Sequence, residues 1–263
     1  MLKPIRVLRS QLLCGLVLVL LVVAIPGCSS QSPDSTEQLA ESDRDYLHLW
    51  KTLKPAPIVI PPDSGGQALL TRNFYFIVDG SGSMRERPTQ KCGGDQKFAD
   101  KMAGAQWAIN KFLEQVPEDV NIGLYVFDSY GKREVVPLGS GNRESFFKAI
   151  ANIDAGGGTP LTGAIRVGTN RLVEQYKKQL GYGEFRLVVI TDGEAEDIPG
   201  AAVYAARCGI PIYAIGLCVE PNHPLRTFSV SYQAADSFAD LSQSLKDTLA
   251  ELPNYDATQF EKK

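Results

Sequence analysis

Two runs of consecutive apolar residues, each ending at an aspartate, constrain the fold of this chain more than any other feature. The first is FYFIVD, residues 74–79, and the second is LVVITD, residues 187–192. An unbroken apolar run fits a strand that is buried on both faces, as in a parallel sheet covered by helices. Ligands of such sheets gather at the carboxyl ends of the strands, which is where both aspartates lie.

Segments with helical spacing separate these strands and others along the chain. Apolar residues recur every three or four positions between Phe98 and Leu113, and Pro117 closes that helix. We expect further helices over residues 143–153, 160–180, 198–207 and 237–252, and further strands over 120–128, 134–138 and 210–217. Strands that alternate with helices predict an α/β fold with a mostly parallel central sheet and helices on both faces.

Five oxygen-bearing side chains lie in the turns that follow strands or glycine-rich segments. They are Asp79, Ser81, Ser83, Thr159 and Asp192. Thr159 follows three glycines and precedes Pro160, so we also expect its hydroxyl to cap a helix that has Pro160 in its first turn. Hydroxyls with few carboxylates suit a hard cation such as Mg²⁺, which prefers six oxygens at about 2.1 Å. The residues therefore predict one divalent-metal site, and they do not distinguish Mg²⁺ from Mn²⁺ or Ca²⁺.

In order and spacing, these five residues resemble the metal ion-dependent adhesion site of von Willebrand factor type A domains. Asp79, Ser81 and Ser83 match the first motif of that site, Thr159 the second and Asp192 the third. The resemblance covers residues 71–252 and implies a doubly wound fold. It also implies a cation that accepts a carboxylate from a protein partner as its last coordinating group.

Two further acids and one loop lie close to this expected site. Asp128 and Glu194 are near strand ends, and we expect them to orient water molecules around the cation. The loop over residues 85–96 should overhang the cation, either as an element that selects the ligand or as a solvated turn.

The amino terminus has the pattern of a signal peptide. Lys3, Arg6 and Arg9 precede a fourteen-residue apolar segment over residues 12–25. As a helix this segment would span about 21 Å, which is short of a hydrocarbon core of roughly 30 Å and disfavours a transmembrane anchor.

The end of that segment, IPGC at residues 25–28, resembles a bacterial lipobox, which implies cleavage before Cys28 and attachment of lipid, palmitate included, to Cys28. Ser29 then implies delivery to the outer membrane, facing the periplasm or the exterior, with simple membrane retention as the alternative. We therefore expect a lipoprotein of the bacterial cell envelope.

These features divide the chain into four parts. They are a signal peptide (1–27), a tether with a short helix and a Pro-rich connector (28–70), the main domain (71–252) and a polar tail (253–263). The formal charge is −3, and removal of the signal peptide leaves 24 basic against 30 acidic residues. Because no basic block occurs, we expect no nucleic-acid partner.

Three cysteines remain outside the signal peptide and the lipid anchor, in a compartment that permits disulfides. Cys208 and Cys218 flank a strand that would part them by about 26 Å, beyond the reach of a disulfide of about 7 Å between α-carbons. Cys92 and Cys218 are both expected at the carboxyl edge of the sheet. We therefore predict a Cys92–Cys218 disulfide with Cys208 as a free thiol, and three unpaired thiols as the alternative.

Three classes of function remain open. The favoured class is a lipid-tethered module that binds an acidic group of an unidentified protein through its metal. A structural envelope protein, in which the metal only stabilises the fold, is the second. A metal-assisted hydrolase is the third and least favoured, because the only histidines, His48 and His223, have no neighbouring nucleophile in sequence and no common hydrolase motif occurs. We therefore predict that the protein is not an enzyme.

Overall fold

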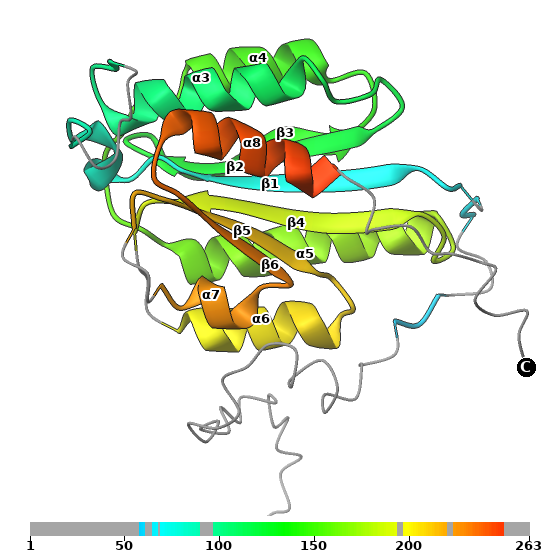
Figure 1. Ribbon diagram of the computed structural model, residues 1–263. Coiled ribbons are helices and arrows are strands. Elements are labelled where there is room, and N and C mark those ends of the chain that lie inside the picture. The colour runs from blue at the N-terminus through cyan, green and yellow to red at the C-terminus, as the bar shows by residue number, and fades with distance from the viewer. Residues whose placement is uncertain are drawn as a thin grey trace, which may run out of the picture. The chain divides into compact units, whose positions relative to one another are not determined.

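A six-stranded, mostly parallel sheet forms the centre of the protein (Figure 1). The computed structural model describes residues 58–60, 65–67, 69–89, 97–193, 197–219 and 223–249. Within them the strand order is β3-β2-β1-β4-β5-β6, and every neighbouring pair is parallel except β2 and β3. The strands are β1 Arg72–Asp79, β2 Asn121–Asp128, β3 Gly131–Gly139, β4 Glu184–Thr191, β5 Ile212–Leu217 and β6 Ser231–Ala235. The predicted α/β fold class is thus confirmed.

Helices cover both faces of this sheet. One face is covered by α3 (Lys101–Leu113), α4 (Arg143–Ala151) and α8 (Phe238–Leu249), and the other by α5 (Leu161–Lys178), α6 (Ile198–Arg207) and α7 (Leu225–Phe228) (Figure 1). Side chains of β1 alternate between the two cores: Phe76 and Val78 pack in the first, and Tyr75 and Ile77 in the second. The unbroken apolar run of β1 follows from this burial on both faces.

Successive strands are added to the sheet on one side of β1 and then on the other, so the order of strands reverses between β1 and β4. From β1 the chain passes through α3 to β2 on one side, whereas β4 leads through α6 and β5 to β6 on the other side. Ligands of doubly wound sheets bind at this switch point, beyond the carboxyl ends of the strands. Asp79 ends β1 at this point, and Asp192 directly follows β4.

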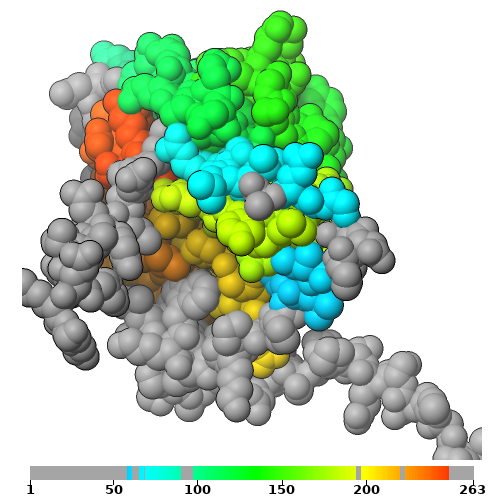
Figure 2. Space-filling model, turned by 90° about the vertical axis from the view of Figure 1, so that its right-hand side faces the viewer, coloured from blue at the N-terminus to red at the C-terminus, as the bar shows by residue number. Residues whose placement is uncertain are grey.

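The chain enters β1 at the amino ends of the parallel strands, away from the switch point. The buried side-chain amide of Gln179 donates to the carbonyl oxygens of Leu69 (2.9 Å) and Thr71 (3.2 Å), and the backbone N–H of Gln67 donates to the Lys178 carbonyl (2.9 Å). Figure 2 looks onto this edge, where the segment that leads into β1 (cyan) lies beside the start of β4 (yellow-green). The connector is therefore fixed to the domain on the side away from the switch point.

Some elements differ from the sequence-based expectations. β6 and the four-residue helix α7 were not expected, and the short extended piece predicted over residues 134–138 is the longer antiparallel edge strand β3. No helix within the described ranges combines the length and hydropathy needed to cross a bilayer. The predicted signal peptide, tether helix and carboxyl-terminal tail lie outside the described residues.

Candidate metal centre

The carboxylate of Asp79 is held at the end of β1 by two donors. Its side chain is fully buried. The backbone N–H of Ser81 donates to Oδ1 (2.8 Å), and the hydroxyl of Thr191 donates to Oδ2 (2.6 Å). The second bond follows from the parallel register, which pairs Val78 with Ile190 and so ends β1 and β4 at the same level. Asp79 is therefore fixed between the two central strands.

Two serine hydroxyls connect the β1 loop to the β4 loop. Ser81 precedes the 3₁₀ helix η2 (Gly82–Arg85), and this tight turn brings its Oγ within 3.1 Å of Ser83 Oγ. The Ser83 hydroxyl donates to Asp192 Oδ1 at 2.7 Å across 109 residues of sequence. Ser81, Ser83 and Asp192 thus form one hydrogen-bonded chain between the β1 loop and the β4 loop.

The glycine-rich loop before α5 is tied to the same place through its backbone. The N–H of Gly156 donates to the Gly80 carbonyl (2.8 Å), and the N–H of Gly82 donates to the Gly157 carbonyl (3.0 Å). Gly157 has a φ of +81°, a left-handed conformation that glycine adopts without strain. These two bonds place Thr159, two residues after Gly157, beside the β1 loop.

Thr159 does not cap a helix, in contrast to the expectation. α5 begins at Leu161 with Pro160 as its N-cap, and no side chain caps it; the Leu161 N–H instead bonds to the Thr159 carbonyl (2.8 Å). Proline at the cap shifts the helix start by one residue, and the Thr159 hydroxyl makes no hydrogen bond with any described residue. A methyl group built on Gly193 would lie 3.7 Å from this hydroxyl oxygen and 4.0 Å from Asp79 Oδ2. All five predicted residues therefore converge beyond the carboxyl ends of the central strands β1 and β4.

Lys101, at the start of α3, supplies a positive charge to this cluster. Its Nζ lies 2.9 Å from Asp192 Oδ2 and 3.1 Å from Glu86 Oε2, and the Asp192 side chain is fully buried. Partial burial on its own would lower the pKa of Lys101, but the bonds to Asp192 and Glu86 outweigh this effect and raise it. Lys101 was not expected at this site, because a lysine 91 residues from its partner carries no local signal.

Burial disfavours the ionised form of the Asp79 carboxyl. Burial raises the pKa of the Asp79 carboxyl above its ordinary value, and the charge of Asp192 adds to the rise, while the bonds from Ser81 and Thr191 act in the opposite direction. A divalent cation would offset this desolvation and the repulsion between the two carboxylates.

The donor set fits a hard cation. Two carboxylates and three hydroxyls supply only oxygen, which suits Mg²⁺, Mn²⁺ or Ca²⁺ and not a thiophilic metal. No group of three or more His, Cys, Asp or Glu side chains that could hold a metal is found in the described ranges. If the hydroxyls bind a divalent cation directly and the two aspartates act largely through water, the cation would keep positive charge for a further anionic group. The hydroxyl of Thr159, free of hydrogen bonds to described residues, is available as a ligand.

Of the two acids expected to orient water, Asp128 is described, and it forms an ion pair with Arg133. Asp128 is fully buried at its side chain and binds Arg133 through both oxygens (2.6 and 3.0 Å), while Oδ1 also accepts the Tyr130 N–H (2.9 Å). These contacts hold the turn between β2 and β3. Glu194 lies outside the described residues.

His223 supports the loop that carries Asp192. The ring is buried, and its Nδ1 accepts the Leu225 N–H (3.2 Å). With Nδ1 as acceptor, the neutral ring carries its proton on Nε2, which donates to the Gly193 carbonyl (2.8 Å). This role of His223 carries no local signal in the sequence, because its contact is with a carbonyl 30 positions away.

The cysteines are partly described. Cys218 is disulfide-bonded, and its partner lies outside the described residues; Cys208 is a free thiol. Cys92 also lies outside them, so the Cys92–Cys218 pairing stays a prediction.

Comparison with known families assigns most of the described fold to one domain. Residues 73–251 match the family model described as von Willebrand factor type A domain. No curated protein matches the chain significantly.

Solved structures share the fold at low sequence identity. The pilus adhesin SpaC from Lactobacillus rhamnosus GG aligns with a TM-score of 0.51 and 16% identity, over 70% of this chain and 31% of its own. A von Willebrand factor type A protein from Catenulispora acidiphila gives 0.51 and 19%, over 68% and 42%. The conserved hypothetical protein BatB from Bacteroides thetaiotaomicron gives 0.50 and 18%, over 67% and 98%. The match therefore spans less than half of the adhesin and of the Catenulispora protein.

Proposed function

Because the chain belongs to the von Willebrand factor type A domain family, we propose that it binds a divalent cation, Mg²⁺ in the first place, and through it an acidic group of a protein partner. One observation carries this proposal: oxygens from three distant segments, at Asp79 to Ser83, at Thr159 and at Asp192, meet at the switch point of the sheet. The cation would be held by Ser81, Ser83 and Thr159 with the two aspartates, and it would supply the positive charge that a ligand carboxylate needs.

The setting that we propose is the bacterial cell envelope. The amino-terminal pattern up to Cys28 supports a lipid anchor, with the outer membrane favoured by Ser29. A pilus adhesin shares the fold, which fits a role in adhesion or protein capture.

We propose a binding protein and not an enzyme. The histidine in the described residues, His223, is buried, with one ring nitrogen accepting a backbone N–H and the other bonded to a backbone carbonyl. Both ring nitrogens of His223 are therefore engaged in hydrogen bonds to the backbone, and neither is free to activate a nucleophile.

Metal binding is tested most cleanly at Thr159. Thr159→Val removes one oxygen and keeps the side-chain shape, and the hydroxyl has no hydrogen bond within the described residues to lose. We expect Mg²⁺ affinity, measured by isothermal titration calorimetry, to fall at least about tenfold with unchanged thermal stability in chelator. The matched control is Thr71→Val at the opposite edge of the sheet, which should leave the affinity unchanged. Equal affinities for both variants and the native protein would contradict the assignment.

Partner binding separates this function from a purely structural role. Affinity capture from envelope extracts is carried out with Mg²⁺, with chelator, and with the Asp79→Ala and Thr159→Val proteins. Partners lost in chelator and in both variants, while the fold is retained, support capture through the cation. Capture that persists without the cation would instead favour a metal that only stabilises the fold.

A further inference from the structure

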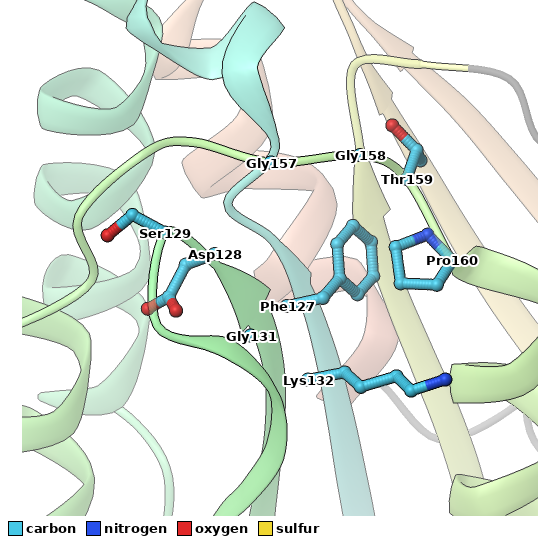
Figure 3. Close-up of a pocket in the computed structure, with 9 residues that line it drawn as sticks. All are labelled: Phe127, Asp128, Ser129, Gly131, Lys132, Gly157, Gly158, Thr159 and Pro160. Atoms are coloured by element: carbon cyan, nitrogen blue, oxygen red, sulfur yellow. The ribbon is translucent and has the colours of Figure 1, made fainter.

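A pocket of about 600 Å³ adjoins the proposed cation site on the α5 side of the sheet (Figure 3). Thr159, Pro160 and Gly158 form one wall, from the glycine-rich loop and the start of α5. Phe127, Asp128 and Lys132 form the other wall, from the end of β2 and the start of β3. Because Thr159 belongs to both the pocket and the proposed cation site, the two sites adjoin at this residue.

The charges around this pocket favour an anion. The carboxylate of Asp128 is neutralised by its two bonds to Arg133. Lys132 is exposed and makes no ion pair with any described residue. The remaining charge of the pocket is therefore the ammonium of Lys132, next to the positive charge that a bound cation would add.

The position of Lys132 is set by the strand register. Lys132 is the cross-strand partner of Phe127 in the antiparallel pair β2–β3, so both side chains lie on the same face of the sheet, the face that α5 covers. Figure 3 shows the Lys132 side chain extending alongside Phe127 and Pro160 toward α5. The lysine thus stands across the pocket from Thr159.

The size of the pocket limits the ligand. A sphere of the pocket's volume would be about 10 Å across, which is within the range of peptide and small-ligand sites. In an extended peptide, side chains at positions i and i+2 share one face and are roughly 6.6 Å apart, whereas neighbours point to opposite faces. Two acidic side chains at i and i+2 therefore point the same way, so one extended segment can present both of them to this face of the protein.

We propose that this pocket is a second anchor point for the partner, and that the partner presents an extended segment with acidic residues at positions i and i+2. One carboxylate binds the cation and the other binds Lys132. This inference rests on the proposed function, since the first carboxylate needs the cation.

Three seven-residue Gly-Ser peptides test the spacing. They carry Glu-Ser-Glu, Glu-Glu-Ser or Glu-Ser-Ser at their centre, and dissociation constants are measured by NMR titration of isotope-labelled protein in Mg²⁺ and in chelator. We expect the Glu-Ser-Glu peptide to bind up to about fivefold more tightly than the other two, the size of one partly exposed ion pair. Lys132→Met should remove this preference and keep binding of the Glu-Ser-Ser peptide, while Lys177→Met, an exposed lysine near the end of α5, should keep the preference.

A charge reversal makes the test independent of small losses of stability. Lys132→Glu should prefer a Glu-Ser-Lys peptide to the Glu-Ser-Glu peptide, which a partly unfolded protein would not do. Binding that needs Mg²⁺ but is equal for all peptides, or a preference that survives in Lys132→Met, overturns the second anchor and leaves the proposed function intact. Absence of any chelator-sensitive peptide binding overturns the proposed function, and the second anchor with it.

Discussion

Lys101 places a fixed positive charge where a divalent cation would also be attracted. Its ammonium lies 2.9 Å from the buried carboxylate of Asp192. Since ammonium and cation repel each other, we expect Lys101→Met to strengthen Mg²⁺ binding about tenfold. In the metal-free protein the same change leaves Asp192 without this partner, so we expect the free energy of unfolding to fall by about 1–3 kcal/mol. Calorimetric titration and denaturant unfolding in chelator measure the two effects.

Lys111→Met is the matched control for this prediction. Lys111 lies in the same helix and, among the described residues, forms an ion pair with Glu114 alone; both side chains are about half exposed. We expect the free energies of Mg²⁺ binding and of unfolding to change by no more than about 1 kcal/mol, the contribution of an exposed ion pair. If Lys101→Met binds Mg²⁺ no more tightly than Lys111→Met, the ammonium does not compete with the cation.

We expect Asp79 to make Mg²⁺ binding depend on pH. Burial raises the pKa of its carboxyl in the metal-free protein. The protonated form stabilises the metal-free fold, and that contribution is lost as the pH rises through the folded-state pKa. Metal binding has the opposite dependence, because the cation must displace this proton. We expect weaker Mg²⁺ binding at about pH 5 than at about pH 7.5, with proton release that calorimetry in two buffers detects; equal affinities would exclude a carboxylate ligand.

At the scale of single residues, the sequence predicted those site residues that stand in a recognisable local pattern. Asp79, Ser81 and Ser83 stand together in one turn, and Asp192 follows an apolar strand, so their convergence was predictable from strand ends alone. Lys101 and His223 were not predictable, because each acts through one contact across the fold, to Asp192 and to the Gly193 carbonyl. Finding them needed the positions of the α3 start and of the α7 loop.

The loops at the switch point depend on a close approach at Gly80. A methyl group at this position would lie 2.8 Å from Ile153 Cγ2, 2.9 Å from Asp128 Cβ and 3.0 Å from the Phe127 carbonyl oxygen. Two of these neighbours are fixed by the backbone and cannot move aside. We expect Gly80→Ala to lower the free energy of unfolding by about 1–3 kcal/mol and to weaken Mg²⁺ binding, since the β1 loop must shift. Denaturant unfolding and calorimetric titration measure these changes.

Gly82→Ala serves as the comparison within the same loop. There the nearest neighbour of an added methyl group is the Gly157 carbonyl oxygen at 3.4 Å. We expect a much smaller loss of stability than in Gly80→Ala. Similar losses for both variants would mean that general stiffening of the loop, and not the contact at Gly80, is responsible.

Among the elements, those with a strong apolar pattern were predicted and those without one were missed. β1, β2 and β4 are almost entirely buried, so tertiary packing and local sequence agree. β6 has the sequence SYQAA and is mostly half-buried at the sheet edge, so it lacks the apolar run that marks the central strands. It forms because its backbone pairs with β5, an interaction that no local pattern records.

At the scale of the whole molecule, the segment that leads into β1 and the proposed cation site lie at opposite ends of the strands. The segment before β1 is bound to Lys178 and Gln179 at the amino edge, and β1 then runs eight residues, about 26 Å, to Asp79. A chain anchored upstream at Cys28 would therefore join the domain on the side away from its site. We expect this route of the chain to leave the proposed site accessible to a partner when the protein is attached through the predicted lipid at Cys28.

Cys28→Ser tests the anchor and this arrangement together. We expect the variant to lose labelling by radioactive palmitate and to move from the membrane to the soluble fraction, because Cys28 is the residue predicted to carry the lipid. Since attachment and site lie at opposite edges, Mg²⁺ affinity should be the same for the released protein and for the lipidated protein in vesicles. A Cys28→Ser protein that stays in the membrane fraction would show that the apolar segment over residues 12–25 holds it there instead. An affinity that differs between the two forms would mean that the membrane contacts the site, contrary to the route of the chain into β1.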